Sequence, residues 1–321
     1  MTNWNKEFEN IFINPVQTHG NIIILKEDSQ FENQSQTNEI FSEKWLKNDN
    51  RNGLNNFEGF QRKWYLDLYG FNNEEELSVF LKTKKIILDA GCGLGYKAAW
   101  FATLSPESLV IGMDFSDSIF RAAKNYSTIP NLFFVKGDIA ETNIRFNSLD
   151  YVSCDQVIHH TENPPLTFTH LCNILKPSGE FACYVYAKKA LPRELLDDYF
   201  RDFSKKCSKE ELWKMSRGLT ELGKNLSEVN LKFNCPDIPL LGIKGGEYDI
   251  QRFLYWNFLK CFWNPEMGYE ESVDTNFDWY GPSNAFRYSE QEYKKIITDN
   301  NLQIIYFHKE EACYSGRFMK Q

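Results

Sequence analysis

The sequence has little basic charge and no long apolar run. Lys and Arg total 36 against 44 Asp and Glu, which gives a net charge of −8 and a pI of about 5.3. This balance repels polyanions, and no basic stretch is long enough to offset it, which disfavours a nucleic-acid substrate. No apolar run approaches the roughly 20 residues of a membrane-spanning helix, so we expect no membrane partner.

Paired cysteine motifs are also missing. Eight cysteines are scattered along the chain without any Cys-x-x-Cys pair, which excludes a zinc ribbon and a dithiol redox motif. The polar residues 1–9 do not have the composition of a signal peptide. We therefore expect reduced thiols and a cytoplasmic location.

Aromatic residues are abundant, at 16% of the 321 residues. Aromatic side chains fill cores and also line pockets for flat or cationic ligands. The length predicts one α/β domain with an additional segment.

A regular alternation of short apolar runs and helical stretches begins near residue 85. Strands are predicted at residues 86–89, 109–113, 132–135, 150–154 and 180–186, with helices beginning near Tyr96, Ser116 and Pro165. Ser116 is expected to be an N-cap, and residues 176–179 are expected to form a turn between a helix and the fifth strand. This spacing is typical of βαβ units and predicts a parallel sheet.

The flanking segments have a different composition. Residues 1–70 are polar and predict a lid or wrap, followed by a core over 71–189 that begins with a short helix at 74–82. Residues 190–285 are mostly helical and aromatic, with helices at 191–203, 209–226 and 248–262, and predict a cap inserted after the fifth strand. Residues 286–321 are expected to complete the sheet with a helix at 289–301 and a hairpin of strands at 302–308 and 314–320.

The most informative motif is Asp-x-Gly-x-Gly-x-Gly from Asp89 to Gly95, where a buried strand runs through a glycine-rich turn into a helix. Such a turn presents backbone N–H groups and a positive helix end to a nucleotide-like ligand. Tyr96 occupies the last glycine position of a dinucleotide fingerprint, and the Gly-Lys-Ser/Thr ending of a P-loop is absent. No group is therefore dedicated to phosphate, and Asp89 is suited to face a cationic amine.

From about residue 84 to 186 the sequence resembles the class I S-adenosylmethionine-dependent methyltransferases. The resemblance implies a Rossmann-like, mostly parallel sheet of seven strands in the order 3-2-1-4-5-7-6. It implies S-adenosylmethionine as cofactor and S-adenosylhomocysteine as product, with Asp114 on the ribose hydroxyls and Asp138 on the adenine amine. The complete set of implied cofactor residues is Asp89, Gly91, Cys92, Gly93, Gly95, Asp114, Phe115, Gly137, Asp138, Ile139, Asp155 and Gln156. Each strand-end carboxylate alone is also a common helix cap, but three at βαβ spacing favour the cofactor site.

Residues 150–164 resemble the family's Ser-x-x-Val-Leu-His-His-Thr-x-Asp-Pro segment beside the cofactor methyl group. By analogy, His159 is favoured over His160 as a general base, because a histidine pKa lies near neutrality. The alternative is that one histidine caps a helix and the other packs under the adenosine. Asp155 faces the sulfonium or the substrate in one interpretation and is a loop carboxylate in the other.

Several other residues are candidates for the site. Trp45, Lys47, Arg62 and Trp64 are placed to fold over the cofactor, although surface charge and packing explain such residues more often. Residues 278–282 resemble an Asp-Trp-Tyr-x-Pro element, and the predicted substrate residues are Trp279, Tyr280, Tyr186 and Arg287. No metal is expected, because residues 186–189 lack the carboxylate and asparagine of metal-assisted relatives.

The function predicted from these patterns is methyl transfer to an O atom, or an N atom, of a small molecule in cofactor or secondary-metabolite biosynthesis. Three alternatives stay open: an RNA or protein methyltransferase, a module that binds S-adenosylmethionine or S-adenosylhomocysteine without turnover, and an NAD-dependent oxidoreductase. A homodimer is also left open.

Overall fold

A computed structural model describes residues 4–49 and 54–321. The chain divides into two units, one formed by Met1–Tyr186 with Phe286–Gln321 and the other by Ala187–Ala285. We call them the first unit and the second unit. Over the described residues, no helix combines the length and the apolar character needed to cross a membrane.

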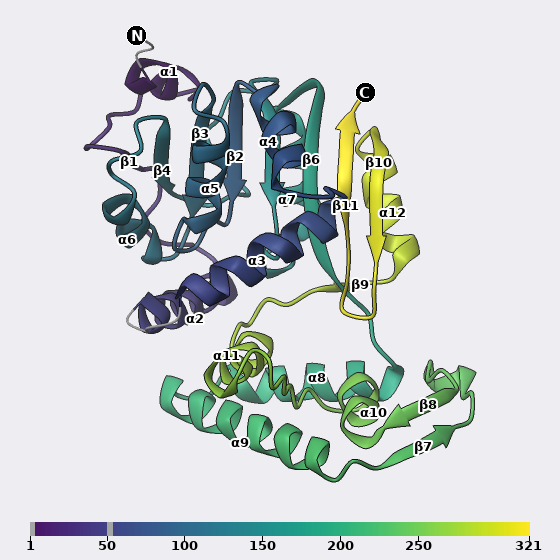
Figure 1. The fold of residues 1–321 in the computed structure, drawn as a ribbon. Helices are drawn as coiled ribbons and strands as arrows, with labels where there is room; N and C mark the ends of the chain where they lie inside the picture. Colours follow the sequence, from purple (N-terminus) through teal and green to yellow (C-terminus); the bar gives the residue numbers. More distant parts are fainter. Residues whose placement is uncertain (1–3, 50–53) are drawn as a thin grey trace. The chain divides into compact units, whose positions relative to one another are not determined.

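The first unit is built on a mostly parallel sheet (Figure 1). Its order is β1-β4-β3-β2-β5-β6-β11-β10, and β9 pairs with β6. The strands are β1 Ile22–Ile24, β2 Ile86–Ala90, β3 Leu109–Asp114, β4 Leu132–Lys136, β5 Leu149–Cys154, β6 Leu175–Ala187, β9 Arg287–Tyr288, β10 Leu302–Lys309 and β11 Cys313–Lys320. Strand β11 runs antiparallel to both of its neighbours. The predicted seven-strand order is confirmed from β4 to β10, and β1 and β9 are additions.

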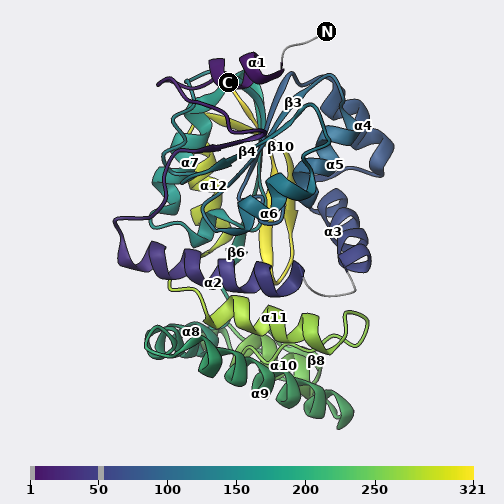
Figure 2. The same ribbon diagram turned by 90° about the vertical axis from the view of Figure 1, so that its left-hand side faces the viewer.

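Helices cover both faces of this sheet (Figure 2). They are α1 Trp4–Asn10, α2 Glu32–Asp49, α3 Leu54–Tyr69, α4 Glu74–Lys82, α5 Tyr96–Leu104, α6 Ser118–Asn125, α7 Pro164–Ile174 and α12 Glu290–Asp299, with a 3₁₀ turn, η1, at Ile158–His160. One buried cluster contains Phe8 of α1, Phe168 of α7 and Tyr293 of α12. The other contains Tyr65 of α3 and Trp100 of α5. The first unit is therefore a three-layer α/β fold.

Local sequence explains where several helices begin. Asn73 caps α4 by accepting a hydrogen bond from the Glu76 N–H, and Ser289 forms a capping box with Glu292 at the start of α12. These side chains satisfy N–H groups that have no partner within the helix. The predicted helices at 74–82 and 289–301 are confirmed within two residues at each end.

The expected N-cap at Ser116 is wrong. Helix α6 begins at Ser118, with Asp117 at the cap position. The Ser116 hydroxyl donates instead to Asp114 Oδ1 at 2.6 Å. A hydrogen bond to a carboxylate is stronger than one between neutral groups, and this bond orients the hydroxyl toward the strand end.

Two other element boundaries differ from the prediction. Residues 176–179 lie within β6, where the pairing skips from Leu149–Leu175 to Tyr151–Glu180 and Ser178 has a φ of 64°. Residues 176–179 therefore interrupt the pairing of β6 with β5. The predicted helix at 248–262 is only Ile250–Asn257, because Tyr248 lies in a strand.

The second unit contains four helices and a hairpin in its described residues. They are α8 Leu191–Ser204, α9 Lys209–Glu228, β7 Lys232–Cys235, a 3₁₀ turn η2 Pro239–Leu241, β8 Gly246–Asp249, α10 Ile250–Asn257 and α11 Tyr269–Tyr280. Helix α11 packs on α9, where the Phe277 and Trp213 rings stack with centroids 3.7 Å apart. The predicted helices at 191–203 and 209–226 are confirmed, whereas α11 and the hairpin were not expected.

Candidate cofactor and active site

The glycine-rich turn between β2 and α5 requires glycine for two separate reasons. Gly91, Gly93 and Gly95 have φ values of 81°, 54° and 80°, which other residues rarely adopt. There is also no room for a side chain, since a Cβ on Gly95 would lie 2.8 Å from the Phe134 ring, and one on Gly91 would overlap Val157. The turn therefore keeps backbone N–H groups close to any ligand at the start of α5.

Three carboxylates lie at or just beyond the carboxyl ends of the adjacent strands β2, β3 and β4. Asp114 accepts hydrogen bonds from the Gly93 N–H at 2.7 Å and from the Ser116 N–H at 2.8 Å. Asp138 accepts from the Ala140 N–H through Oδ1 at 2.9 Å. Burial raises the pKa of both carboxyl groups, against these hydrogen bonds. Ligands of open α/β sheets bind at this edge.

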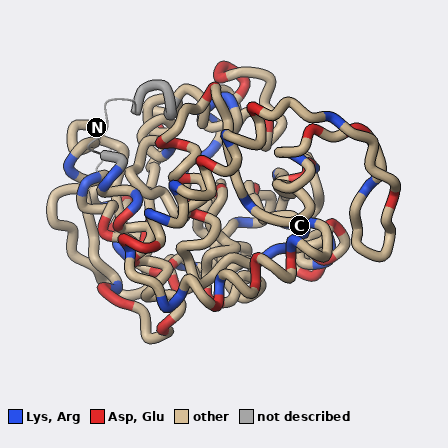
Figure 3. The backbone as a smooth tube through the Cα atoms, turned by 90° about the horizontal axis from the view of Figure 1, so that it is seen from below, with Lys and Arg blue, Asp and Glu red and all other residues tan. Residues whose placement is uncertain are grey.

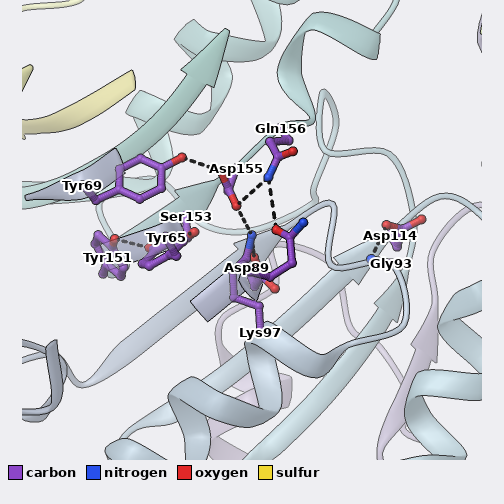
Figure 4. A network of polar contacts seen from close by, with 11 residues as sticks. Tyr65, Tyr69, Asp89, Gly93, Lys97, Asp114, Tyr151, Ser153, Asp155 and Gln156 are labelled. Atoms are coloured by element: carbon purple, nitrogen blue, oxygen red, sulfur yellow. Dashed lines mark hydrogen bonds and ion pairs between the residues drawn. The ribbon is translucent and has the colours of Figure 1, made fainter. Parts of the chain in front are cut away.

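Asp89 of β2 faces a cation supplied by the chain itself (Figure 4). Lys97, on the first turn of α5, places its Nζ atom 3.2 Å from Asp89 Oδ1 and 3.2 Å from Asp155 Oδ2. Lys97 and Asp155 are 6% and 7% exposed, and Asp89 is fully buried. The ammonium therefore bridges two carboxylates inside the first unit.

The charges of this group are strongly coupled. Burial raises the pKa of Asp89 to about 6, although Lys97 opposes the shift. Burial alone would lower the pKa of Lys97, but Asp155 and Asp89 outweigh it and the pKa is raised. Lys97 is therefore protonated at every physiological pH.

Tyrosines of α3 hold the other side of Asp155. The Tyr69 hydroxyl donates to Asp155 Oδ1 at 2.8 Å, and the Tyr65 hydroxyl lies 2.6 Å from the Tyr151 hydroxyl of β5. Gln156, with a φ of 63°, donates weakly to Asp155 at 3.5 Å. Figure 4 shows these groups converging after β5. The polar N-terminal segment is thus tied into the core through buried hydroxyls.

Helix α2 covers the glycine turn. The Trp45 ring lies so close to Gly93 that a Cβ there would come within 3.1 Å of it, and the Ser42 hydroxyl accepts from the Asp117 N–H at 3.0 Å. On the same helix, Phe41 contacts the edge of the His160 ring at 4.9 Å. This arrangement suits a cover that excludes water.

The two histidines occupy the 3₁₀ turn η1 after β5. His159 is fully buried, with its ring centroid 3.8 Å from that of Tyr186, and its carbonyl accepts from the Phe286 N–H at 2.9 Å. The His160 Nε2 atom is 3.5 Å from the Tyr186 hydroxyl. The structure therefore brings together three of the predicted residues, His159, His160 and Tyr186.

The remaining predicted residues have diverse surroundings. Cys92 and Ile139 are 5% exposed, the Phe115 carbonyl accepts from Lys136 at 3.3 Å, and the Gly137 N–H donates to the Asp114 carbonyl at 3.0 Å. Arg287 begins β9, whereas Trp279 and Tyr280 belong to the second unit.

The lid candidates after Trp45 have packing partners within the first unit. Arg62 lies 3.9 Å from Glu74 and against the Trp100 ring. The Trp64 ring packs against Tyr184 at 6.1 Å. Lys47 is half-buried on α2.

One group of metal-type ligands occurs among the described residues. His308, Glu310 and Cys313, at the turn between β10 and β11, have ligand atoms within 4.8 Å of one another. His308 and Glu310 also pair at 3.6 Å. The prediction of no metal stays a prediction.

Sequence reasoning missed Lys97, Tyr65 and Tyr69. The signal for Lys97 is a single lysine in the otherwise apolar start of α5. A lone charge on a buried helix needs a partner, and Asp89 lies directly before the turn. The tyrosines gave no comparable signal, because their hydroxyl partners come from β5 and its following loop.

Comparison with known proteins finds similarity to methyltransferases. Residues 81–236 match the model of a methyltransferase domain. The chain is 26% identical over 140 residues to a demethylmenaquinone methyltransferase of Listeria monocytogenes, covering 40% of this chain and 59% of that protein. It is 25% identical over 202 residues to a ubiquinone biosynthesis O-methyltransferase of Coxiella burnetii, covering 58% and 80%.

Solved structures agree at the level of the fold. PKMT2 from Rickettsia typhi is 17% identical with a TM-score of 0.50, covering 75% of this chain and 49% of that one. The match to the Listeria relative spans less than two thirds of that protein, at 59% of its length. Residues 81–236, just under half of the chain, are thus similar to a methyltransferase domain, and the class I S-adenosylmethionine-dependent methyltransferases are the family that the chain resembles.

Proposed function

We propose that the protein is an enzyme that transfers a methyl group from S-adenosylmethionine to an O or N atom of a small molecule, with O preferred. The observation that carries this proposal is the set of Asp89, Asp114 and Asp138 on three adjacent parallel strands around the glycine turn. A cytoplasmic location, a homodimer and a role in cofactor or secondary-metabolite biosynthesis are finer parts of the same proposal.

The residues around the turn fit the cofactor chemically. Asp138 Oδ2 accepts no hydrogen bond from any described residue, which leaves it available to the adenine amine, with buried Ile139 beside it. Asp114 Oδ2 accepts only from the Gly93 N–H among the described residues and keeps an acceptor site for a ribose hydroxyl, whereas Oδ1 already accepts two bonds from Ser116. In the turn, the N–H groups of Gly91, Cys92, Gly93 and Gly95 already donate to Met113, Asp114 and Cys92, which leaves the Leu94 N–H as the donor for a ligand carboxylate. When bound, the cofactor supplies a methyl group activated by a positive sulfur.

Because Lys97 bridges Asp89 and Asp155, these two carboxylates have a role other than binding the cofactor directly. Both carboxylates already neutralise a buried ammonium, so in this proposal they shape the floor of the site. Cys92, Phe115, Gly137 and Gln156 line it in the same scheme. The methionine part then lies at the turn and the start of α5, without a direct bond to these two carboxylates.

The chain's catalytic work is to hold the acceptor, exclude water and receive a proton. Alignment of a bound nucleophile contributes about 7–11 kcal/mol in favourable cases. His159 and His160 are the proposed bases, and the Tyr186 hydroxyl, 3.5 Å from His160 Nε2, is a partner that would orient that ring. A general base adds about 10²–10⁴ in rate.

The charge distribution supports a small acceptor. Lys and Arg are interspersed with Asp and Glu along the chain (Figure 3), and the net charge is −8. A duplex or RNA acceptor would need concentrated positive charge. RNA and protein acceptors are therefore controls in the test below.

The first test measures S-adenosylhomocysteine binding by calorimetry. In Asp114→Asn one acceptor oxygen becomes a donor, so we expect at least about a tenfold loss of affinity. Asp299→Asn is the matched control, because Asp299 pairs only with Lys295 on the surface of α12. Absence of binding to the unchanged protein would overturn the proposal.

The second test measures transfer of labelled methyl groups to hydroxyl and amine compounds, with RNA and protein as control acceptors. We expect product only with small acceptors and loss of product in Asp114→Asn. Binding without product across the panel would favour a non-catalytic module instead.

A further inference from the structure

The second unit contains a buried lysine whose ammonium has no anionic partner. Lys260 follows α10 and is 7% exposed. Its Nζ atom lies 4.4 Å from the Trp279 ring centroid and 5.9 Å from that of Tyr255. Over the described residues, no side chain or carbonyl forms a hydrogen bond or ion pair with this atom, since only the Lys260 backbone N–H donates, to the Tyr280 hydroxyl. The faces of the Trp279 and Tyr255 rings lie close to the charge.

Two other cations share the Trp279 ring. The Arg193 guanidinium carbon lies 5.2 Å from the ring centroid and Lys189 Nζ lies 5.9 Å from it. The ring is thus the common neighbour of three positive groups from the start of the unit, from α8 and from the segment after α10. All of them belong to the second unit.

One nearby carboxylate, that of Asp197, is already committed. Asp197 accepts from Arg193 Nε at 2.8 Å and from the Tyr280 hydroxyl at 2.7 Å. Arg193 also donates to the Tyr255 carbonyl. This network fixes Arg193 but provides no hydrogen-bonding partner for the Lys260 ammonium.

The electrostatics of Lys260 follow from these neighbours. Burial, together with Arg193 and Lys189, lowers its pKa to about 7, against the opposing effect of Asp278 and Asp197. Tyr255 and Tyr280 are the other titratable groups that face it, and burial raises the pKa of both. A buried ammonium among like charges is unfavourable, and an entering anion would relieve the cost.

We propose that Lys260, Lys189 and Arg193 form an oxyanion-binding site against Trp279, which takes a carboxylate or phosphate group. The Lys260 ammonium provides the uncommitted donors, Lys189 and Arg193 provide long-range attraction, and Trp279 provides a flat apolar wall.

The proposal is tested with the full chain and two probes, acetate and inorganic phosphate, against chloride at equal ionic strength. Calorimetry at pH 6.5 should detect binding of at least one oxyanion. Because only protonated Lys260 binds it, affinity should weaken about tenfold per pH unit above pH 7. The relative affinity for acetate and phosphate distinguishes the two sources of the oxyanion.

Two variants test whether the oxyanion binds at the cluster of Lys260, Lys189 and Arg193. Lys260→Met should weaken oxyanion binding at least about tenfold. Lys224→Met is the matched control, because Lys224 also lies near a tryptophan ring of the same unit, at 5.9 Å from Trp263. It should bind as the unchanged protein does. If Lys260→Met does not fold, the pH dependence of the unchanged protein still decides the proposal.

The outcome is separable from the proposed function. S-adenosylhomocysteine binding, measured on the same samples, should be unchanged in Lys260→Met, and Asp114→Asn should keep its oxyanion affinity. No binding of either probe, or equal binding in folded Lys260→Met, would overturn the site while leaving cofactor binding intact.

Discussion

The two units bury a lysine in opposite ways. Lys97 lies between Asp89 and Asp155, each at 3.2 Å, and its pKa is raised. Lys260 lies among aromatic rings and other cations, and its pKa is lowered to about 7. Burial is similar, at 6% and 7% exposed, so the partners determine the sign of the shift. A lysine with complete partners stabilises a fold, whereas one without them is available to a ligand.

Removing Lys97 should have the largest effect on stability. Lys97→Met leaves two buried carboxylates without their cation, and breaking a buried ion pair costs about 3–5 kcal/mol. Urea unfolding at pH 7 should show this loss. Lys260→Met, by contrast, should be neutral or stabilising, because it removes an ammonium without an anionic partner.

The loss in Lys97→Met should also depend on pH. Without the cation, the pKa of Asp89 rises further above its unfolded value, so the folded state binds more protons than the unfolded state. Stability then falls as pH rises from about 4 to 7, more steeply than in the unchanged protein. If Lys97→Met and Lys260→Met were equally stable, the contrast between the two buried lysines would be wrong.

The different origin of the two sites explains what the sequence could predict. The candidate cofactor site of the first unit could be predicted from a short stretch of sequence, because a strand, a glycine turn and a helix follow one another from Asp89 to Tyr96. The seven-strand order of the first unit was implied by the family resemblance, whereas the βαβ spacing alone predicted a parallel sheet. Lys97 and Asp155 are 58 residues apart, and neither position alone indicates the other. Their bridge depends on β2 and β5 being neighbours.

The sequence of the second unit gave weaker evidence for its fold and for its proposed site. Its aromatic residues indicated a packed cap, but helix α11 was not expected, because its polar first half, Tyr269–Asn276, has no simple apolar period. Lys189, Arg193, Lys260 and Trp279 come from four separate segments. Composition predicted rings near the substrate, whereas only the packing of α8 against α10 and α11 brings cations to one of them.

Removing the Tyr69 hydroxyl should lower the free energy of unfolding less than removing Lys97 does. Its hydroxyl donates to the Asp155 carboxylate at 2.8 Å, and hydrogen bonds to charged groups are worth about 1.5–3 kcal/mol. Tyr69→Phe should lose this amount in chemical unfolding. The matched control is Tyr65→Phe, whose hydroxyl meets the neutral Tyr151 hydroxyl at 2.6 Å.

The control loss should be smaller, at about 0.5–1.5 kcal/mol. Equal losses in the two variants would mean that Asp155 does not carry its charge in the folded protein. In that case Lys97 would depend on Asp89 alone, and the contrast with Lys260 would be weaker.

A further expected effect is a pH-dependent difference in the free energy of unfolding between Lys260→Met and the unchanged protein. Below pH 7 Lys260 is protonated in both the folded and the unfolded protein, so its burial cost is fully present. Between pH 7 and about 10 the folded protein releases this proton while the unfolded chain keeps it, so stability rises by at most about 1.4 kcal/mol per pH unit. The methionine variant lacks this slope. Its stability relative to the unchanged protein should therefore decrease from pH 7 to pH 9 in oxyanion-free buffer, and added phosphate should shift the rise to higher pH, because a bound oxyanion keeps Lys260 protonated.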